Sequence, residues 1–287
     1  LNEKVECPGL IRVDNWAVHD HGQSANSVRY LKPVDIIMMS SNVGISKVSR
    51  RMTPENHRDL LTKFGFGQKT LSGLNGEVPG ILPRLPWVAS RQSTIAFGQG
   101  IAVTPLQIVT AMSAIANKGQ RVEPRIIHQI VSPDGHMIKE FPTVINRTLS
   151  ESTADKILDM MSHVVEGDHG TARAGKISGY KMAGKTGTAD KVVAGRYNGD
   201  VISSFIGILP ANEPKFVIMV LLDSPRTAHY ASMTAVPVFK EIAHHMIIYY
   251  GIEPTLQEEL KTAKPKEKSA ETESTPPESQ EPHPARR

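Results

Sequence analysis

The sequence is short of cysteine, of net charge and of long hydrophobic runs, and each shortage excludes a class of protein. The single cysteine, Cys7, excludes a disulfide framework and a cysteine-rich metal site. A formal net charge of +4 over 287 residues is too small for the basic surface of a nucleic-acid-binding protein. The longest apolar run, Phe216 to Leu222, has the length of a buried strand and falls short of the roughly 20 residues of a membrane span.

What remains is an ordinary globular composition. Hydrophobic residues make up 39% and charged residues 22%, which excludes disorder of the whole chain and predicts one large domain or two modest ones. The first residue is Leu1 and not Met, so we expect a processed product or a fragment whose targeting or anchoring segment preceded it.

The C-terminal end has a different composition from the rest. Residues 261–287 contain no large apolar residue and are rich in proline and in charges of both signs, so burial cannot offset their ordering entropy. We therefore predict a folded domain over residues 1–254 and a disordered tail over residues 255–287.

Helix signals dominate the first two thirds of the folded part. Thr53-Pro54 and Thr104-Pro105 each read as an N-cap followed by proline at the first helical position, and Gln107 completes a capping box with Thr104. Ser152 to Asp155 is predicted to open a further helix. Residues 126–141 are typical of a hairpin around Pro133-Asp134-Gly135.

The last third favours an antiparallel meander closed by a helix. Residues 180–189, 201–209 and 216–223 are strand-like and are separated by Gly-, Asn- and Pro-containing turns, and residues 235–250 carry a helical apolar stripe. The order of helices, then strands, then a helix predicts the α+β class and not alternating βαβ units.

One lysine lies in two competing motifs. Gly179 to Thr186 fits the phosphate-binding pattern G-x-x-x-x-G-K-[ST], but the residues before it make a poor buried strand and the glycines after it favour a hairpin over a helix. Lys185-Thr186-Gly187 instead fits K-T-G, which serine β-lactamases and penicillin-binding proteins combine with S-x-x-K and S-D-N. Ser40-Ser41-Asn42 supplies the second element in the form S-x-N, at the expected end or junction of a helix.

Several further segments, in the same order along the chain, strengthen this interpretation. From about residue 7 to residue 254 the sequence resembles class B penicillin-binding proteins, the cell-wall transpeptidases, and is most similar to the division (septal) type. The segments that carry the resemblance are S-S-N-V-G-I-S-K at 40–47, F-G-F-G at 64–67 with Gly76-Glu77, F-G-Q-G-I-A-V-T-P-L-Q at 97–107, A-N-K-G at 116–119, G-T-A at 170–172 and G-K-T-G-T-A at 184–189.

The resemblance implies a transpeptidase fold, an antiparallel sheet packed with helices plus a helical subdomain holding S-x-N. It also implies acyl transfer, in which a serine attacks the D-Ala-D-Ala amide of a peptidoglycan stem peptide and an amine of a second stem peptide takes the acyl group. Such a reaction needs an activated nucleophile, a proton route, an oxyanion hole and a grip on the terminal carboxylate.

The resemblance also implies a role for each motif residue. Ser40 would relay a proton, because a hydroxyl donates and accepts at once. Asn42 would hold the substrate amide, and Lys185 would supply positive charge beside Ser40 and the substrate carboxylate. Thr186 and Thr188 would offer hydroxyls to that carboxylate, Gly187 would let the substrate backbone lie against the strand, and the Thr188 N–H would be one oxyanion donor.

The third motif of the family is missing at the expected place. The family carries its nucleophile in S-x-x-K, about fifty residues before S-x-N, and here that position falls before residue 1. The S-x-x-K at Ser178 to Lys181 follows S-x-N and leads directly into K-T-G, so we interpret it as a chance match. We therefore expect the isolated chain to be inactive, and to be insoluble or molten because the strand at 216–223 would lose its family partner strands and become an open edge.

Alternatives stay open at this point. The same fold serves D,D-carboxypeptidases and β-lactamases, and a non-catalytic penicillin-binding-like module is a third interpretation. We expect no cofactor; His19-Asp20-His21 is a weak metal candidate that reads more simply as a solvated loop. Expected partners are stem peptides, β-lactam antibiotics and, for the full-length form, divisome membrane proteins, with the catalytic domain on the extracytoplasmic (periplasmic) side of the cell membrane.

Overall fold

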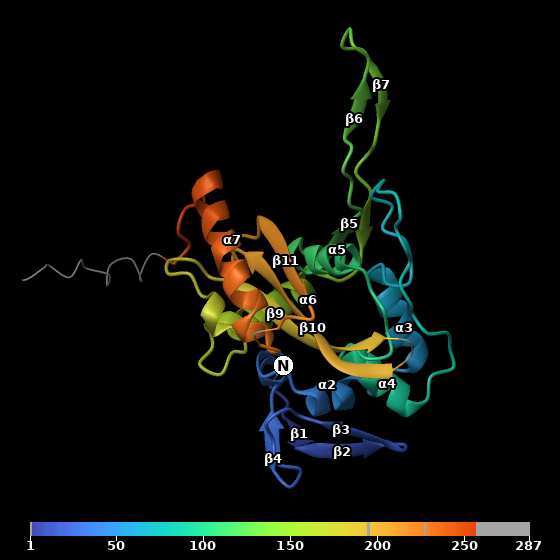
Figure 1. Ribbon diagram of the computed structural model, residues 1–287, viewed down its shortest axis with the longest axis vertical. Coiled ribbons are helices and arrows are strands. Elements are labelled where there is room, and N and C mark those ends of the chain that lie inside the picture. Colours follow the sequence, from blue (N-terminus) through green and yellow to red (C-terminus); the bar gives the residue numbers. More distant parts are fainter. Residues whose placement is uncertain (1, 194–195, 227, 257–287) are drawn as a thin grey trace, which may run out of the picture.

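The computed structural model describes residues 2–193, 196–226 and 228–256, and at its centre lies a three-stranded antiparallel sheet (Figure 1). Its strands are β9 (Ala183–Val193), β10 (Arg196–Leu209) and β11 (Phe216–Asp223), in the order β11-β10-β9. Each strand pairs with its neighbour in sequence, so the predicted meander is confirmed.

Helices pack against both faces of this sheet. On one face lies α7 (Ala235–Tyr250), and the ring of Phe205 meets that of Phe239 edge-on at a centroid distance of 4.7 Å. Gly207 is needed on the same face, because a Cβ there would come within 2.3 Å of the Phe239 ring. On the other face Ile208 packs against side chains of α5 (Pro105–Ala116) and α6 (Glu151–Glu166). This layered arrangement of an antiparallel sheet and helices confirms the α+β class.

Capping residues set where the helices begin. Thr53 accepts a hydrogen bond from the Asn56 N–H at the start of α3 (Pro54–Lys63), and Thr104 forms the predicted capping box at the start of α5. The start predicted for α6 was two residues late. Its N-cap is Ser150, whose hydroxyl accepts from the Thr153 N–H.

The expectation that helices come first along the chain was wrong. Four short strands precede them: β1 (Val5–Pro8) pairs with β4 (Val28–Leu31), and β2 (Leu10–Val13) pairs with β3 (Trp16–His19). These four-residue strands have no sustained alternation, and β1 pairs with a strand some 20 residues away, so pattern alone did not reveal them.

The four strands and the first helices enclose a second core. It joins the strand residues Val5, Cys7 and Val18 to Ile36 of α1 (Pro33–Met38) and Val43 of α2 (Asn42–Ser49), with α4 (Ala89–Ala96) packed against α2. Cys7 is fully buried there, and burial raises the pKa of its thiol.

A hairpin projects from the body of the molecule (Figure 1). It is formed by β6 (Gln129–Val131) and β7 (Met137–Glu140), inside the range predicted for a hairpin, and a second pair of strands, β5 (Gln120–Val122) and β8 (Ile145–Arg147), forms its base. All seven residues of β6 and β7 are exposed. Two short 3-10 helices, η1 (Arg173–Gly175) and η2 (Ala231–Met233), complete the set of regular elements in the described ranges.

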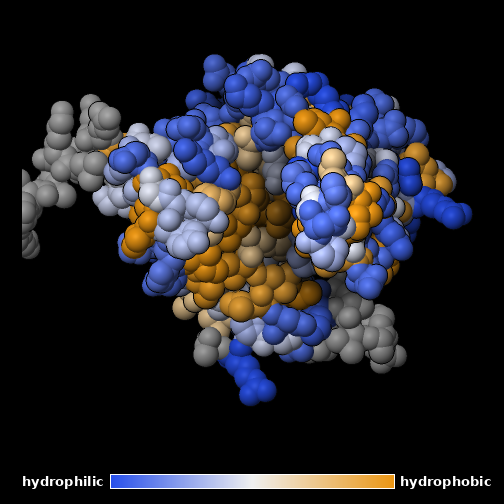
Figure 2. Space-filling view, turned by 90° about the horizontal axis from the view of Figure 1, so that it is seen from above, coloured by the Kyte–Doolittle hydropathy of each residue, from blue (hydrophilic) through white to orange (hydrophobic). Residues whose placement is uncertain are grey.

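The outer edge of β11 is open in the described part of the chain, as the family resemblance led us to expect. Leu221 of β11 and the neighbouring α7 residues Val238 and Ile242 are exposed apolar side chains. Seen from above, the molecule presents a broad hydrophobic area beside the projecting hairpin (Figure 2). No helix in residues 2–193, 196–226 and 228–256 has the length and apolar character required to cross a membrane.

The predicted tail begins too early. The backbone N–H groups of Thr255 and Leu256 donate to the Gly179 carbonyl at 2.9 and 3.0 Å, and the Thr255 hydroxyl accepts from the Lys181 N–H. These two residues therefore belong to the folded domain. Residues 257–287, which carry the rest of the prediction, lie outside the described residues.

Candidate active site

The S-x-N turn, residues 40–42, lies where α1 gives way to α2. Ser40 has a left-handed backbone conformation, with φ at 56°, which is unfavourable for a residue with a side chain and is maintained only by surrounding contacts. Ser41 is buried and acts as N-cap of α2, accepting from the Gly44 N–H at 2.9 Å. Ser40 is thereby presented on an exposed corner, as the sequence predicted for a helix junction.

The side chain of Lys185, in β9, contacts Ser40. Its Nζ donates to the Ser40 hydroxyl at 2.8 Å and to the Thr186 carbonyl at 3.0 Å. Ser40 and Lys185 are 145 residues apart in sequence, so only the tertiary fold brings the S-x-N turn and the K-T-G strand together. Asn42 lies at the first turn of α2, and its amide donates to the His19 carbonyl at 3.2 Å.

The environment of Lys185 weakens its hold on the proton. Burial lowers the pKa of its ammonium from the usual 10.5 to about 8. A lysine with that pKa exchanges a proton near neutral pH, and it does so in contact with a hydroxyl that accepts and donates. The pair is therefore able to pass a proton between a group bound at Ser40 and the lysine.

The other residues of the K-T-G strand differ in their contacts and exposure. Thr186 shares a hydrogen bond of 3.1 Å with the hydroxyl of Thr171, and Thr188 is exposed. Gly187 is opposite Ser204 of β10, and a Cβ at position 187 would lie 2.6 Å from the Ser204 hydroxyl. A side chain at position 187 would therefore require the Ser204 hydroxyl to rotate away.

The edge position of β9 matters for binding. In the described sheet β9 pairs only with β10, so the backbone groups on its outer side face away from any neighbouring strand. An extended peptide laid along that side would pair with the strand as an added β-strand does.

The two rival interpretations of Lys185 and Ser178 do not fit the structure. Gly184 to Thr186 lie inside β9, whereas a phosphate-binding loop needs a helix to begin there. Ser178 is exposed in the turn between the bridged residues Ile177 and Tyr180, and Lys181 pairs with Asp159 of α6 at 3.3 Å. The S-x-x-K at 178–181 therefore does not pair its serine with its lysine on a helix.

Two carboxylates, Glu77 and Asp20, were not given a role from the sequence. Glu77 accepts hydrogen bonds from the Thr70 and Ser72 hydroxyls and from the Leu71 and Ser72 N–H groups, and these bonds lower the pKa of its carboxyl to about 2. It organises a loop that includes Leu71 in a left-handed conformation.

The carboxylate of Asp20 lies beneath the S-x-N turn, although the sequence suggested only a weak metal candidate there. In the described ranges no three His, Cys, Asp or Glu side chains are grouped to hold a metal ion.

Comparison with known proteins agrees with this geometry. Residues 1–244 match the family described as "Penicillin binding protein transpeptidase domain". The chain is 36% identical over 265 residues to "Penicillin-binding protein PbpB" of Mycolicibacterium smegmatis, covering 88% of this chain and 40% of that protein. It is 34% identical to "Probable peptidoglycan D,D-transpeptidase PenA" of Neisseria flavescens, covering 77% of this chain and 53% of the relative.

Solved structures show the same likeness. Penicillin-binding protein 3 of Mycobacterium tuberculosis, in complex with aztreonam, superposes with a TM-score of 0.81 at 35% identity, over 88% of this chain and 58% of that one. The chain thus spans about 40% of the full length of its PbpB relative, and about half that of PenA.

Proposed function

Because the chain belongs to the penicillin-binding protein transpeptidase family, we propose that it carries the S-x-N and K-T-G parts of a serine D,D-transpeptidase site that cross-links peptidoglycan stem peptides. The observation that carries the proposal is the 2.8 Å hydrogen bond from Lys185 to Ser40. It joins two motifs distant in sequence into one site with a proton-exchanging lysine.

The roles proposed for Ser40 and Lys185 are supported by their contact, and those proposed for the other motif residues come from the family resemblance. Ser40, exposed and hydrogen-bonded to Lys185, is placed to pass a proton to the leaving amine. Lys185, with a pKa of about 8, takes up or returns that proton near neutral pH. Thr186 and Thr188 bind the terminal carboxylate of the stem peptide, and the Thr188 N–H serves as one oxyanion donor. Asn42 holds the substrate amide.

The nucleophile in this proposal is a serine of an S-x-x-K motif other than Ser178. Ser178 lies in an exposed turn, and the lysine three residues later is paired with Asp159. The experiments below therefore use the protein as its gene encodes it, so that any residues outside 1–287 are present.

We further propose that the protein acts on the outer side of the cytoplasmic membrane, where peptidoglycan is assembled, and that β-lactam antibiotics acylate it. The second point is supported by the likeness to a structure solved with aztreonam. A septal role and divisome membrane proteins as partners are proposed from the resemblance of the motifs to division-type enzymes.

The test is covalent labelling with a fluorescent penicillin, using two lysine variants. Lys185→Ala should abolish labelling, because it removes the ammonium in contact with Ser40. Lys181→Ala is the matched control: it removes the same side chain four residues earlier, where the ammonium contacts Asp159, and should keep most of the labelling.

The outcomes separate the candidate activities. A labelled enzyme that stays acylated and joins two stem peptides supports the transpeptidase. Rapid turnover of the penicillin would show a β-lactamase, and release of D-Ala to water without cross-linking would show a carboxypeptidase. Absence of labelling in the unmodified protein, or equal loss in both lysine variants, would overturn the proposal.

A further inference from the structure

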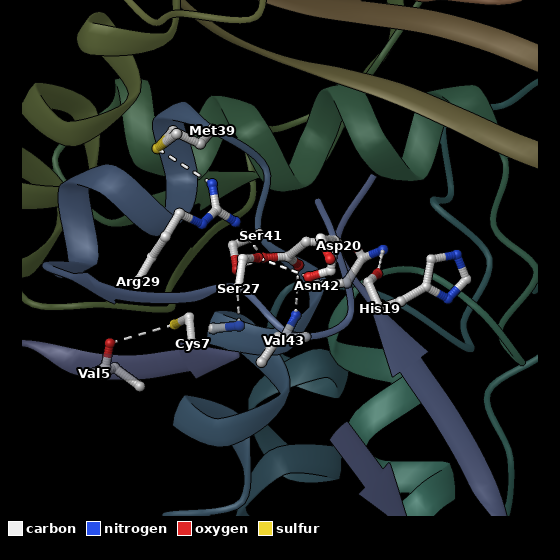
Figure 3. A network of polar contacts seen from close by, with 12 residues as sticks. Val5, Cys7, His19, Asp20, Ser27, Arg29, Met39, Ser41, Asn42 and Val43 are labelled. Atoms are coloured by element: carbon white, nitrogen blue, oxygen red, sulfur yellow. Dashed lines mark hydrogen bonds and ion pairs between the residues drawn. The ribbon is translucent and has the colours of Figure 1, made fainter. Parts of the chain in front are cut away.

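The S-x-N turn rests on a buried acidic side chain. Asp20 follows directly after β3 and is only 4% exposed. A carboxylate buried to that degree needs compensating partners, because removing its charge from water is costly. Figure 3 shows Arg29, Ser41 and Val43 around Asp20.

The Asp20 carboxylate accepts hydrogen bonds from the turn, from the start of α2 and from β4. Oδ2 accepts from the Ser41 hydroxyl at 2.7 Å and from Nη2 of Arg29 at 2.6 Å, and Oδ1 accepts from the Val43 N–H at 2.9 Å. Ser41 is the central residue of S-x-N, and Val43 follows its last residue. The preceding residue, His19, accepts from the Asn42 amide at 3.2 Å.

These contacts surround the one unfavourable backbone conformation of the turn. Ser40 has the left-handed conformation. Two residues that follow it, Ser41 and Val43, donate hydrogen bonds to the Asp20 carboxylate. On the preceding side the Ser41 N–H donates to the Ile36 carbonyl at 2.9 Å. Without the carboxylate, Ser41 would lose its connection to β3, and the turn would be free to relax away from the strained conformation that presents Ser40 to Lys185.

We propose that Asp20 is a positioning residue of the active site, which acts through Ser41 and Val43 to hold the S-x-N turn so that Ser40 contacts Lys185 of the K-T-G strand. The inference deepens the proposed function and rests on it. In this proposal Asp20 does not contact the substrate. It fixes the position of Ser40 and Asn42, which do. His19 and Asp20, which suggested a weak metal site in the sequence, thus accept the hydrogen bonds that fix Asn42 and Ser41 of the S-x-N turn.

The chain supplies a matched control in Asp14. That aspartate directly follows β2 and accepts from the Ser90 N–H at 2.8 Å at the start of α4, as Asp20 accepts from Val43 at the start of α2. Both side chains are carboxylates after a strand that cap a helix N-terminus. The helix that begins near Asp14 does not carry the S-x-N motif.

The experiment compares Asp20→Asn and Asp14→Asn in the protein as its gene encodes it. Asparagine keeps an oxygen for the Val43 N–H, but its NH2 group then faces Ser41 and Arg29 and accepts from neither. We expect Asp20→Asn to lower the rate constant of the acylation step by about 10- to 100-fold, as for a misplacement on the order of 1 Å, with little change in non-covalent penicillin affinity. Asp14→Asn should leave the acylation step unchanged.

A double-variant cycle shows through which residue Asp20 acts. If it works through the S-x-N motif, Asp20→Asn should cost much less when Asn42→Ala is already present. Full additivity of the two losses, or an acylation rate in Asp20→Asn equal to that of the unmodified protein, would overturn the inference. Should Asp20→Asn fail to fold, Ser41→Ala removes the hydroxyl that contacts Asp20 and caps α2, and it should also slow acylation.

A second measurement does not depend on acylation. In NMR titration of Lys185, a turn that has moved away should leave the ammonium more hydrated, so its pKa should rise toward the usual 10.5 in Asp20→Asn and stay near 8 in Asp14→Asn. An unchanged Lys185 titration would count against the inference. If the unmodified protein takes no label at all, the proposed function is wrong, and this titration still tests the positioning role.

Discussion

The buried ammonium of Lys185 should lower the free energy of unfolding at neutral pH. The pKa of Lys185 is lowered to about 8 because the folded state buries its ammonium, whereas the unfolded chain leaves it in water with the usual value of 10.5. Between these two pH values the unfolded state binds more protons than the folded state, so stability rises with pH through this window. Below about pH 8 the penalty is fully present.

The size of the effect follows from the two pKa values. A difference of 2.5 pKa units corresponds to about 3 kcal/mol at pH 7, and roughly 2 kcal/mol of it should be recovered by about pH 9.5. The substitution Lys185→Met keeps the apolar stem and removes the titrating group, along with the hydrogen bonds to Ser40 and Thr186. Those bonds offset part of the gain, so the pH dependence is a cleaner signal than stability at one pH.

The assay is urea unfolding of both forms of the protein at pH 7 and pH 9.5. The free energy of unfolding of the unmodified protein should increase by about 2 kcal/mol relative to Lys185→Met between these two conditions. All other titrating groups are shared, so they cancel in the comparison. A difference between the two forms that stays constant, or moves in the opposite direction, would refute the assignment of a buried lysine with a lowered pKa.

Four further outcomes are expected. Glu77→Gln should lower the melting temperature at neutral pH, and its deficit should shrink as pH falls from about 4.5 toward 2, because the carboxylate contributes stability only while it is ionised; a deficit independent of pH would contradict this. Phe239→Ala should cost about 3–5 kcal/mol in chemical unfolding, since the ring is fully buried against Phe205. In the 287-residue polypeptide alone, Leu221→Lys should reduce aggregation, followed by light scattering, because Leu221 is exposed on a strand whose outer edge is open in the described part of the chain. The 287-residue polypeptide alone should form no boiling-resistant adduct with fluorescent penicillin; a labelled peptide containing Ser178 or Ser40 would contradict the motif assignment.

Local chemistry explains what the sequence predicted well. The capping box of Thr104 and Gln107 uses residues three apart, and the strands of the meander follow one another with short connections. The placement of Ser40 at a helix junction and of Lys185 in a strand rested on equally local signals. Their hydrogen bond, by contrast, was expected from the resemblance to a family, because no local pattern links residues 145 positions apart.

The parts that escaped prediction depend on distant contacts. The strand β1 is stabilised by pairing with β4, and its four residues carry too little alternation to be recognised alone. Asp20 looks in the sequence like any acidic loop residue, and its role appears only when the fold places Ser41 and Val43 against it. The lowered pKa of Lys185 likewise comes from packing around the ammonium and not from its neighbours in sequence.

The buried position of Cys7 has a practical consequence for spectroscopy. Its side chain is fully buried in the core that β1 and β4 form with α1 and α2, and the raised pKa keeps the thiol protonated and unreactive toward maleimides near neutral pH. A second cysteine placed at Asp134, at the exposed tip of the projecting hairpin, would therefore be the site that takes a dye or spin label within residues 1–287. Within these residues the native thiol need not be removed, so the hairpin can be labelled without disturbing the core that supports the S-x-N turn.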